Sequence, residues 1–398
     1  MQDILSNPIC HFTNELGNFT VGGVGTYINE LLQLERPDMT FILLNDDPAT
    51  TMPPYSHAHR VGYYEMDTLQ SLRFETAIFH SYSLAYLAHA SFLRGAKLIY
   101  VIHSVPTTIP WTLQQPFGNH HALTRSFEHL CEVADEIVCV SEAERGKLLT
   151  IYPDLFYKVS VILNGSSLPF SPLRVRNNSE RYPFGFLGRC DERKGLRELC
   201  AAMQHVPGVL EIGCGLENNE YEQQVKHLID KLGLNSRIHW RGRLDGSAKR
   251  VFWERIDALV VPSLWEPFGY VALEALRNGV LPIVSQNGGM TEIVGPDYRY
   301  TFNPWIQSSL INCILRFITD DLETVNREFA NAAFRANALT AMQMAESLRE
   351  LANKPRREHI VHLNRKFSVH HGPYIHPREG DGSKTPARSV YPLRPHSR

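Results

Sequence analysis

Short apolar runs alternate with helical stretches along most of the chain, and this alternation restricts the folds open to it. Helical stretches such as Leu84–Leu93 and Leu123–Val133 separate runs that are typical of buried strands. These runs are Pro8–Phe12, Thr40–Leu44, Ala77–His80, Lys97–Ile102, Glu136–Val140 and Val159–Leu163. Strands that alternate with helices predict a parallel sheet covered on both faces. In such sheets ligands bind at the carboxyl ends of the strands.

The same pattern starts again after residues 166–182, which lack periodicity and contain prolines, so we interpret them as a linker. The later strand-like runs are Phe184–Arg189, Val209–Gly215, Ile238–Arg243, Ala258–Pro262 and Leu281–Ser285. With 398 residues, the chain is expected to form two α/β domains, residues 1–165 and 183–320. Residues 305–319 and 322–353 are expected to be helical, as one helix each.

Composition places the chain among ordinary globular proteins, with 43% hydrophobic and 21% charged residues. We find no apolar run long enough to span a membrane, and no basic segment followed by an apolar one at the N-terminus. The seven cysteines form no C-x-x-C pair, which favours reduced thiols. These features predict a cytoplasmic protein without integral membrane association, and no metal-ligand spacing indicates a metal site.

The net charge of −2 conceals an uneven distribution. Residues 1–165 hold 9 Lys/Arg and 17 Asp/Glu, a net charge of −8. Residues 354–398 hold 10 Lys/Arg, 3 Asp/Glu and six His, a net charge of +7 with almost no apolar periodicity. We expect this basic, His-rich tail to be disordered. Because the positive charge lies in a tail and not on a folded patch, nucleic acid is not expected as a partner.

Residues 258–276 combine a strand, a turn and a helix with two acids. The apolar run is followed by the turn Glu266–Gly269, and Glu274 lies two turns into the helix. A helix N-terminus presents free N–H groups and a positive dipole end, so Phe268, Gly269 and Tyr270 are expected to contact an anion. Glu266 and Glu274 would then hold hydroxyl groups on either side of it. An ordinary strand–turn–helix with a solvated Glu274 is the alternative.

Other candidate binding residues also follow predicted strands. Arg189 and Lys194 lie between a strand and a helix, where a fork-shaped and a point-like cation suit a diphosphate, although solvated surface bases are the alternative. Gly22 and Gly23 precede a helical stretch, either as a phosphate-binding loop or as a plain tight turn. His103 ends a strand, where many histidines have only a structural role.

Taken together, these motifs resemble the retaining glycosyltransferases of family 4, also called glycosyl transferases group 1. The acids of Glu266-Pro-Phe-Gly-x4-Glu274 resemble the family's E-x7-E signature, and Arg189 and Lys194 match its pyrophosphate-binding stretch. Further landmarks occur in the family's order, over roughly residues 8–350: Gly22-Gly23, His103, Ser141-Glu142, Asn164-Gly165, Gly213-Cys214-Gly215 and Gly288-Gly289. Two positions depart from the family, because Ser104 and Cys214 stand where it often has an acid.

The resemblance implies the GT-B fold, in which two Rossmann-like domains face a cleft. Residues 1–165 would bind the acceptor, residues 183–320 the nucleotide sugar, and helices in 321–353 would pack back across the cleft. It implies catalytic roles for His103, Glu266, Arg189 and Lys194. The donor-binding set it implies comprises Gly22, Gly23, Arg189, Lys194, Gly213, Arg243, Glu266, Phe268, Gly269, Tyr270 and Glu274.

The function implied is transfer of a hexosyl group, with retention, from a nucleotide sugar to an acceptor hydroxyl. A UDP-sugar is the expected donor. No Asp-x-Asp occurs in the chain, so we expect neither a metal nor another cofactor. The acidic N-terminal domain favours a soluble acceptor, for example an amino sugar, an aminocyclitol or another natural-product glycoside. Alternatives are a transferase of glycan or glycolipid assembly, a nucleotide-sugar 2-epimerase of the same fold, and a non-catalytic binding module.

Overall fold

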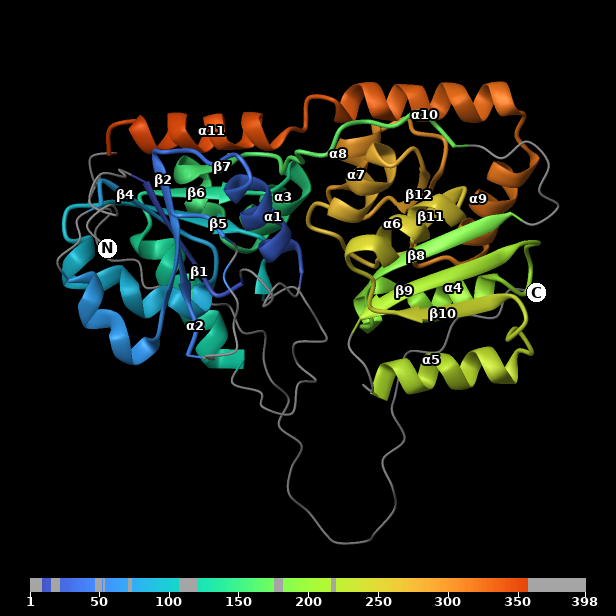
Figure 1. Cartoon of the computed structure of the whole chain (residues 1–398), viewed down its shortest axis with the longest axis horizontal. Coiled ribbons are helices and arrows are strands. Elements are labelled where there is room, and N and C mark those ends of the chain that lie inside the picture. Colours follow the sequence, from blue (N-terminus) through green and yellow to red (C-terminus); the bar gives the residue numbers. More distant parts are fainter. Residues whose placement is uncertain are drawn as a thin grey trace, which may run out of the picture. The chain divides into compact units, whose positions relative to one another are not determined.

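A computed structural model of the chain describes residues 9–15, 22–46, 52, 54–70, 74–106, 120–174, 182–215 and 220–356. Disorder is predicted for the tail, residues 354–398. From residue 357 onward the tail lies outside the described part of the chain. Residues 1–356 form one compact unit that contains two parallel sheets. The predicted fold class is confirmed by these two α/β halves (Figure 1).

The N-terminal sheet has seven parallel strands in the order β3-β2-β1-β4-β5-β6-β7. Strands β1, β2, β4, β5 and β6 are buried along their whole length, as expected for a sheet covered on both faces. The prediction missed the short strand β3. The bounds are β1 Ile9–Thr13, β2 Met39–Leu44, β3 Ala58–Val61, β4 Thr76–Phe79, β5 Lys97–Ile102, β6 Glu136–Cys139 and β7 Val159–Val161.

The helices of this half are α1 (Gly23–Leu32), α2 (His120–Val133) and α3 (Glu142–Ile151). The expected helix Leu84–Leu93 is wrong in type, because the chain forms two 3-10 segments there, η4 (Tyr82–His89) and η5 (Ser91–Leu93). Ala90, with ψ 143°, is extended and interrupts the helical path between them. Further 3-10 segments are η3 (Tyr63–Leu69) and η8 (Pro153–Lys158).

The C-terminal sheet has six parallel strands in the order β10-β9-β8-β11-β12-β13. The strand order reverses direction at β8, so right-handed crossovers place α4 and α5 on one face and α7 and α8 on the other. The carboxyl ends of β8 and β11 are the expected binding crevice at this switch point. The strands are β8 Pro183–Arg189, β9 Val209–Gly215, β10 Ile238–Gly242, β11 Ala258–Val261, β12 Leu281–Ser285 and β13 Thr301–Phe302. The helices are η9 Glu192–Lys194, α4 Leu196–Ala202, α5 Glu220–Lys231, α6 Gly246–Arg255, α7 Tyr270–Arg277 and α8 Met290–Val294.

The last helices are α9 (Gln307–Thr319), α10 (Leu322–Ala336) and α11 (Ala341–Asn353). The single helix expected over residues 322–353 is therefore wrong: it is broken at residues 337–340, where the Thr340 hydroxyl accepts a hydrogen bond from the amide of Gln343 and caps α11. Helix α10 packs on α7 and α8, whereas α11 packs on α1 of the N-terminal half (Figure 1).

Two cations of the N-terminal half bind α11 and the residues that follow it. The Lys97 ammonium donates to the carbonyls of Leu351 (2.5 Å) and Lys354 (2.9 Å). Arg36 of the N-terminal half forms an ion pair with Glu346.

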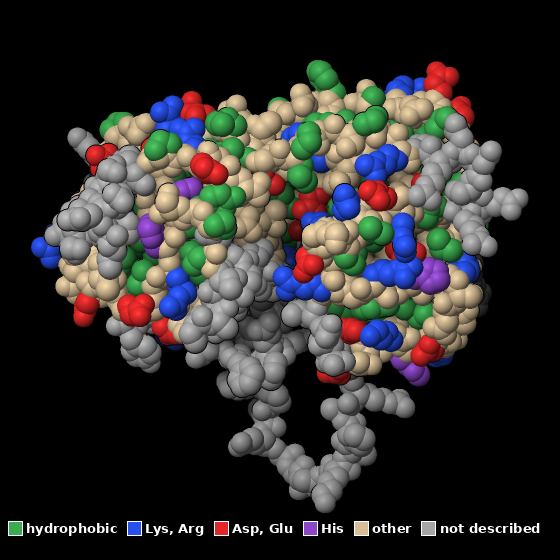
Figure 2. Space-filling model, in the orientation of Figure 1, with side chains coloured by type: hydrophobic (Ala, Val, Ile, Leu, Met, Phe, Trp, Pro, Cys, Tyr) green, Lys and Arg blue, Asp and Glu red, His purple; other side chains and the backbone are tan. Residues whose placement is uncertain are grey.

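On the face drawn in Figure 2, Lys and Arg side chains gather over the C-terminal sheet. None of the helices in the described ranges is both long enough and apolar enough to span a bilayer.

Candidate active site

A largely buried ion pair lies at the carboxyl end of the C-terminal sheet. The Lys194 ammonium is 2.6 Å from Oε2 of Glu266, and the Ser263 hydroxyl donates to the same oxygen at 3.1 Å. Lys194 follows β8 and Glu266 follows β11, and these strands are neighbours in the sheet. Two of the predicted catalytic residues are thus brought into direct contact, although 72 positions separate them in the sequence.

Backbone contacts hold the two turns together. The amide of Leu264 donates to the carbonyl of Arg193 at 2.8 Å. Gly195 has φ +65°, and a Cβ at this position would lie 2.1 Å from the carbonyl oxygen of Pro262. Only glycine permits this approach, so the Lys194-Gly195 sequence sets the position of the ammonium against the Glu266 turn.

The pKa values of the pair both lie below their ordinary values, which favours the carboxylate of Glu266 but not the ammonium of Lys194. Burial raises the pKa of Glu266, but Lys194, Arg193 and Ser263 stabilise the carboxylate and bring its pKa below the ordinary value. Burial lowers the pKa of Lys194 below its ordinary value, and Glu266 offsets only part of that effect. The ammonium is therefore a cation with too little counter-charge, and a phosphate arriving beside it would gain a strong partner.

Arg189 and Arg193 add positive charge at the same end of β8. The Arg189 guanidinium is partly exposed and lies 3.3 Å from the carboxylate of Asp191. Arg193 is buried, and its Nε makes no hydrogen bond within the described part of the chain. Sequence reasoning selected Arg189 and Lys194 but missed Arg193, whose only signal was its place between them.

The turn after β11 presents unused backbone donors. Gly269 caps α7, and the amides of Gly269, Tyr270 and Val271 donate no hydrogen bond to the described residues. The Phe268 side chain is buried and meets the Tyr270 ring at 5.3 Å, so only its backbone is available to a ligand. Free amides at the start of α7, close to Lys194, form an anion-binding arrangement.

The Glu266 turn depends on Gly288, whose φ is +101°. A Cβ there would lie 2.0 Å from the carbonyl oxygen of Glu266. We expect Gly288→Ala to lower the free energy of unfolding by about 3 kcal/mol or more, because strain in φ adds to this overlap. Gly233→Ala is the matched control: its φ is +66°, nothing lies within 4 Å, and the expected loss is about 1 kcal/mol. Urea denaturation measures both, and equal losses would contradict the steric argument.

Other predicted donor-binding residues have partners of their own. Glu274 forms an ion pair with Lys249 at 2.8 Å, so a ribose at Glu274 would have to share the carboxylate. Gly213 has a packing reason for lacking a side chain, because a Cβ would lie 2.6 Å from Cδ1 of Leu244. Arg243 packs against Gly215 at the end of β9. Their roles toward a nucleotide stay predictions.

On the N-terminal half, His103 follows β5 and hydrogen-bonds through Nε2 to Nδ1 of His80 at 3.2 Å. Its ring meets the edge of Tyr27 at 4.9 Å. The Tyr27 hydroxyl is buried without a hydrogen-bond partner in the described part, and so is the Tyr270 hydroxyl. Burial and then the Tyr27 hydroxyl raise the pKa of Tyr270, so Tyr27 interacts electrostatically with the first residue of α7.

The predicted glycine loop already holds a carboxylate. Gly22 caps α1, and the amide of Gly25 donates to Oε2 of Glu15 at 3.2 Å. An anionic ligand at Gly22 and Gly23 would therefore compete with Glu15. Whether these glycines contact a donor stays a prediction.

Hydrogen bonds also join the two halves beside the Glu266 turn. The Ser141 hydroxyl donates to the carbonyl of Pro267 at 2.5 Å, and the Trp265 indole donates to Glu144 at 2.9 Å. The carboxylate of Glu292 accepts both from the amide of Glu142 and from that of Ala143, each at 2.9 Å. The landmark Ser141-Glu142 thus contacts Glu292, three residues after the landmark Gly288-Gly289, and the sequence did not indicate this contact.

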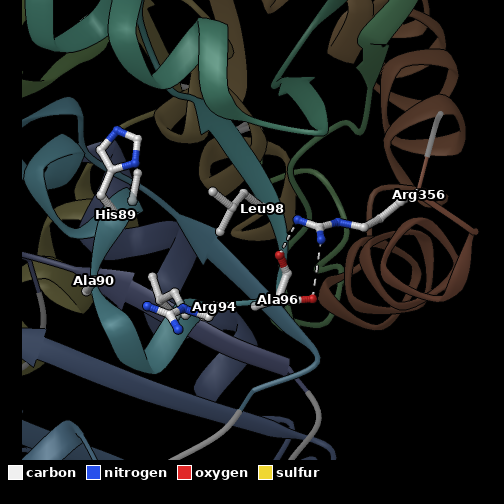
Figure 3. Close-up of a pocket in the computed structure, with 9 residues that line it drawn as sticks. His89, Ala90, Arg94, Ala96, Leu98 and Arg356 are labelled. Carbon is white, nitrogen blue, oxygen red and sulfur yellow. Dashed lines mark hydrogen bonds between the residues drawn. The ribbon is translucent and has the colours of Figure 1, made fainter. Parts of the chain in front are cut away.

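A hollow of about 240 Å³ lies elsewhere, near the amino end of β5. Figure 3 shows Arg356 at its edge, with the guanidinium bonded to the carbonyls of Ala96 (2.5 Å) and Gly95 (3.4 Å). Arg356 also pairs with Asp135 at 3.0 Å. This hollow is on the opposite end of the strands from His103 and contains none of the predicted site residues, so we do not assign the active site to it.

Comparisons with known proteins show similarity to glycosyltransferases. Residues 173–335 match the family described as glycosyl transferases group 1. An uncharacterized glycosyltransferase of Methanocaldococcus jannaschii is 32% identical over 180 residues, which is 40% of this chain and 44% of that protein. The alpha-maltose-1-phosphate synthase of Mycolicibacterium smegmatis is 27% identical over 222 residues, 52% of this chain and 57% of that protein. The matched segments thus span about half the length of these relatives.

Solved structures share the fold over a longer stretch. Sucrose-phosphate synthase from Thermosynechococcus elongatus has a TM-score of 0.70 at 20% identity, with 87% of this chain and 99% of that chain covered. Anabaena HepE in complex with UDP and glucose has a TM-score of 0.70 at 17% identity, with 88% and 100% covered. The predicted resemblance to glycosyl transferases group 1 is confirmed over residues 173–335, and the predicted GT-B fold is confirmed.

Proposed function

We propose that this chain transfers a hexosyl group from a nucleotide sugar to an acceptor hydroxyl. Its residues 173–335 match the family of glycosyl transferases group 1. The observation that carries the proposal is the Lys194–Glu266 pair beside the free amides of α7. A cation with too little counter-charge and a helix N-terminus together suit the diphosphate of a nucleotide sugar.

The leaving diphosphate gains negative charge as the glycosidic bond breaks. We propose that Lys194, Arg189 and the free amides of Gly269 to Val271 stabilise that charge. Since these groups are cationic or donate hydrogen bonds, we propose that the reaction needs no metal. Glu266, next to Lys194, would accept hydrogen bonds from the sugar, and His103 would contact it from the N-terminal half.

UDP-glucose is the first donor to test, since HepE was solved in complex with UDP-glucose. We propose retention at the anomeric carbon, with cations and amides holding the leaving diphosphate so that its oxygen accepts the proton of the acceptor hydroxyl on the same face of the sugar. Glu274, the other acid of the motif, is paired with Lys249.

The acceptor is proposed to be a soluble, neutral or cationic compound, for example an amino sugar or an aminocyclitol. Among the described residues that directly follow β1, β4 and β5, the charged side chain is Glu15, and none is Lys or Arg. The segments 16–21 and 107–119 contain no Lys or Arg in their sequence either. A phosphate on the acceptor would therefore lack a counter-ion next to these strands.

The test is nucleotide release from UDP-, GDP-, ADP- and dTDP-sugars, with and without acceptors, followed by NMR of the product. We expect acceptor-dependent UDP release, an anomeric configuration equal to that of the donor, and no effect of EDTA. For one sugar acceptor, the phosphorylated form should react more slowly than the neutral and the amino forms. An epimerised nucleotide sugar formed without acceptor, or no turnover of any donor, would contradict the proposal, and transfer only to lipid would contradict its acceptor class.

A further inference from the structure

Three histidine side chains form a hydrogen-bonded file across the N-terminal sheet, and His103 is its last member. Nδ1 of His11 is 2.9 Å from Nε2 of His80, and Nδ1 of His80 is 3.2 Å from Nε2 of His103. His11 lies on β1, while His80 and His103 follow β4 and β5. Because these strands are consecutive in the sheet, the three rings lie side by side.

The inner end of the file, at His11, is buried away from solvent. His11 is fully buried and stacks on Phe41 at 4.6 Å, His80 is nearly as buried, and Tyr27 covers the rings of both His80 and His103. Burial lowers the pKa of His11 and of His103 to about 3, and it also lowers that of His80. All three imidazoles are therefore neutral near pH 7.

A neutral imidazole carries one N–H and one lone pair, so the file has two self-consistent proton arrangements. In one, each Nδ1 carries the proton and donates toward His103. In the other, each Nε2 carries the proton and donates toward His11. The two arrangements differ at the ends of the file, at Nε2 of His11 and at Nδ1 of His103.

The inner end decides between them. Nε2 of His11 is buried and has no hydrogen-bond partner in the described part of the chain. The second arrangement would leave an N–H there without an acceptor, whereas the first leaves only a lone pair. An orphaned buried N–H is the rarer of the two kinds of defect. The first arrangement is therefore favoured, and it leaves the proton of His103 on Nδ1.

We propose that His11 and His80 are positioning residues that hold His103 as a neutral imidazole with its Nδ1–H free to donate to a ligand. Nδ1 of His103 makes no hydrogen bond to the described residues, and the ring contacts the ring of Tyr27. The identity of the ligand rests on the proposed function: the acceptor would be an oxygen of the transferred sugar. A neutral donor orients this oxygen without adding positive charge next to the reacting carbon.

The protonated nitrogen can be observed directly by NMR. In protein labelled with ¹⁵N-histidine, long-range ¹H–¹⁵N correlations distinguish the protonated nitrogen from the bare one in each ring, and His103→Gln assigns the signals. We expect Nδ1 of His103 to be protonated and Nε2 bare, in the free enzyme and without substrate. A proton on Nε2 of His103 would overturn the inference.

Two variants of the middle residue test the positioning role. His80→Phe removes both hydrogen bonds, so we expect the proton of His103 to move to Nε2, the tautomer that free histidine prefers, and kcat/KM to fall about 10- to 100-fold. His80→Gln offers an amide N–H toward His103 and a carbonyl toward His11, and should recover the tautomer and most of the activity. His129→Gln is the control, since it removes one member of the exposed pair His89–His129 (2.9 Å) outside this site.

The results separate this inference from the proposed function. An unchanged tautomer in folded His80→Phe would show that His80 does not position His103. The expected tautomer in a protein that turns over no nucleotide sugar would support the file and contradict the proposed function. Should His80→Phe fail to fold, the wild-type tautomer and the His80→Gln variant still decide the question.

Discussion

Replacing Lys194 with methionine is expected to lower kcat/KM for the nucleotide sugar by about 100- to 1000-fold, or roughly 3–4 kcal/mol of transition-state stabilisation. Lys194 pairs with Glu266, which lies against Gly269 at the start of α7, and the ammonium has less counter-charge than its burial demands. Loss of the ammonium removes an interaction that grows as the diphosphate leaves. Steady-state assays of nucleotide release measure the effect, which should appear mainly in kcat.

The controls must separate chemistry from folding. Lys194→Met leaves Glu266 buried without its cation, which destabilises a protein by about 3–5 kcal/mol, so the free energy of unfolding has to be measured as well. The double variant Lys194→Met/Glu266→Gln removes both charges and should regain much of that stability while staying inactive. Lys226→Met, which removes an exposed partner of Glu222, should keep wild-type turnover. Near-normal turnover of folded Lys194→Met would contradict the assigned role.

Acidification from pH 6.5 to 5 is expected to lower the free energy of unfolding steeply because of the buried histidines. The pKa of His11 and of His103 is lowered from 6.5 to about 3, so between these values the unfolded chain binds protons that the native protein does not. The stabilising contribution is complete above pH 6.5 and is lost as the pH falls through this window. Each such histidine contributes a slope of about 1.4 kcal/mol per pH unit, and His80 acts in the same direction.

Urea denaturation at pH 7, 6 and 5 measures this slope. The stacked position of His11 on Phe41 suggests His11→Phe as the test variant, and it should lose about 1.4 kcal/mol per pH unit from the slope, whatever its stability at pH 7. His57 and His59 also have lowered pKa values, but they remain in this variant and cancel in the comparison. An unchanged slope in His11→Phe would show that His11 is not held neutral in the native protein.

Much of the architecture was predictable because its causes are local. Strands such as Lys97–Ile102, Val209–Gly215 and Leu281–Ser285 are apolar runs with the bounds that the sequence predicts, since a strand buried on both faces needs apolar residues throughout. Weaker patterns were misread. The 3-10 segments at Tyr82–Leu93 and the break before Thr340 depend on a few backbone angles that periodicity does not record.

The candidate site, too, was predictable only in part. Sequence patterns were enough to predict two α/β halves and the polar residues at the ends of their strands, because the carboxyl edge of a parallel sheet is where polar side chains meet ligands. Arg189, Lys194, Glu266 and His103 are among these residues. Which of them touch depends on the three-dimensional arrangement of the strands. The adjacency of β8 and β11 pairs Lys194 with Glu266, and the adjacency of β1, β4 and β5 aligns the histidine file. Strand order follows from contacts between distant parts of the chain, and no local pattern encodes it.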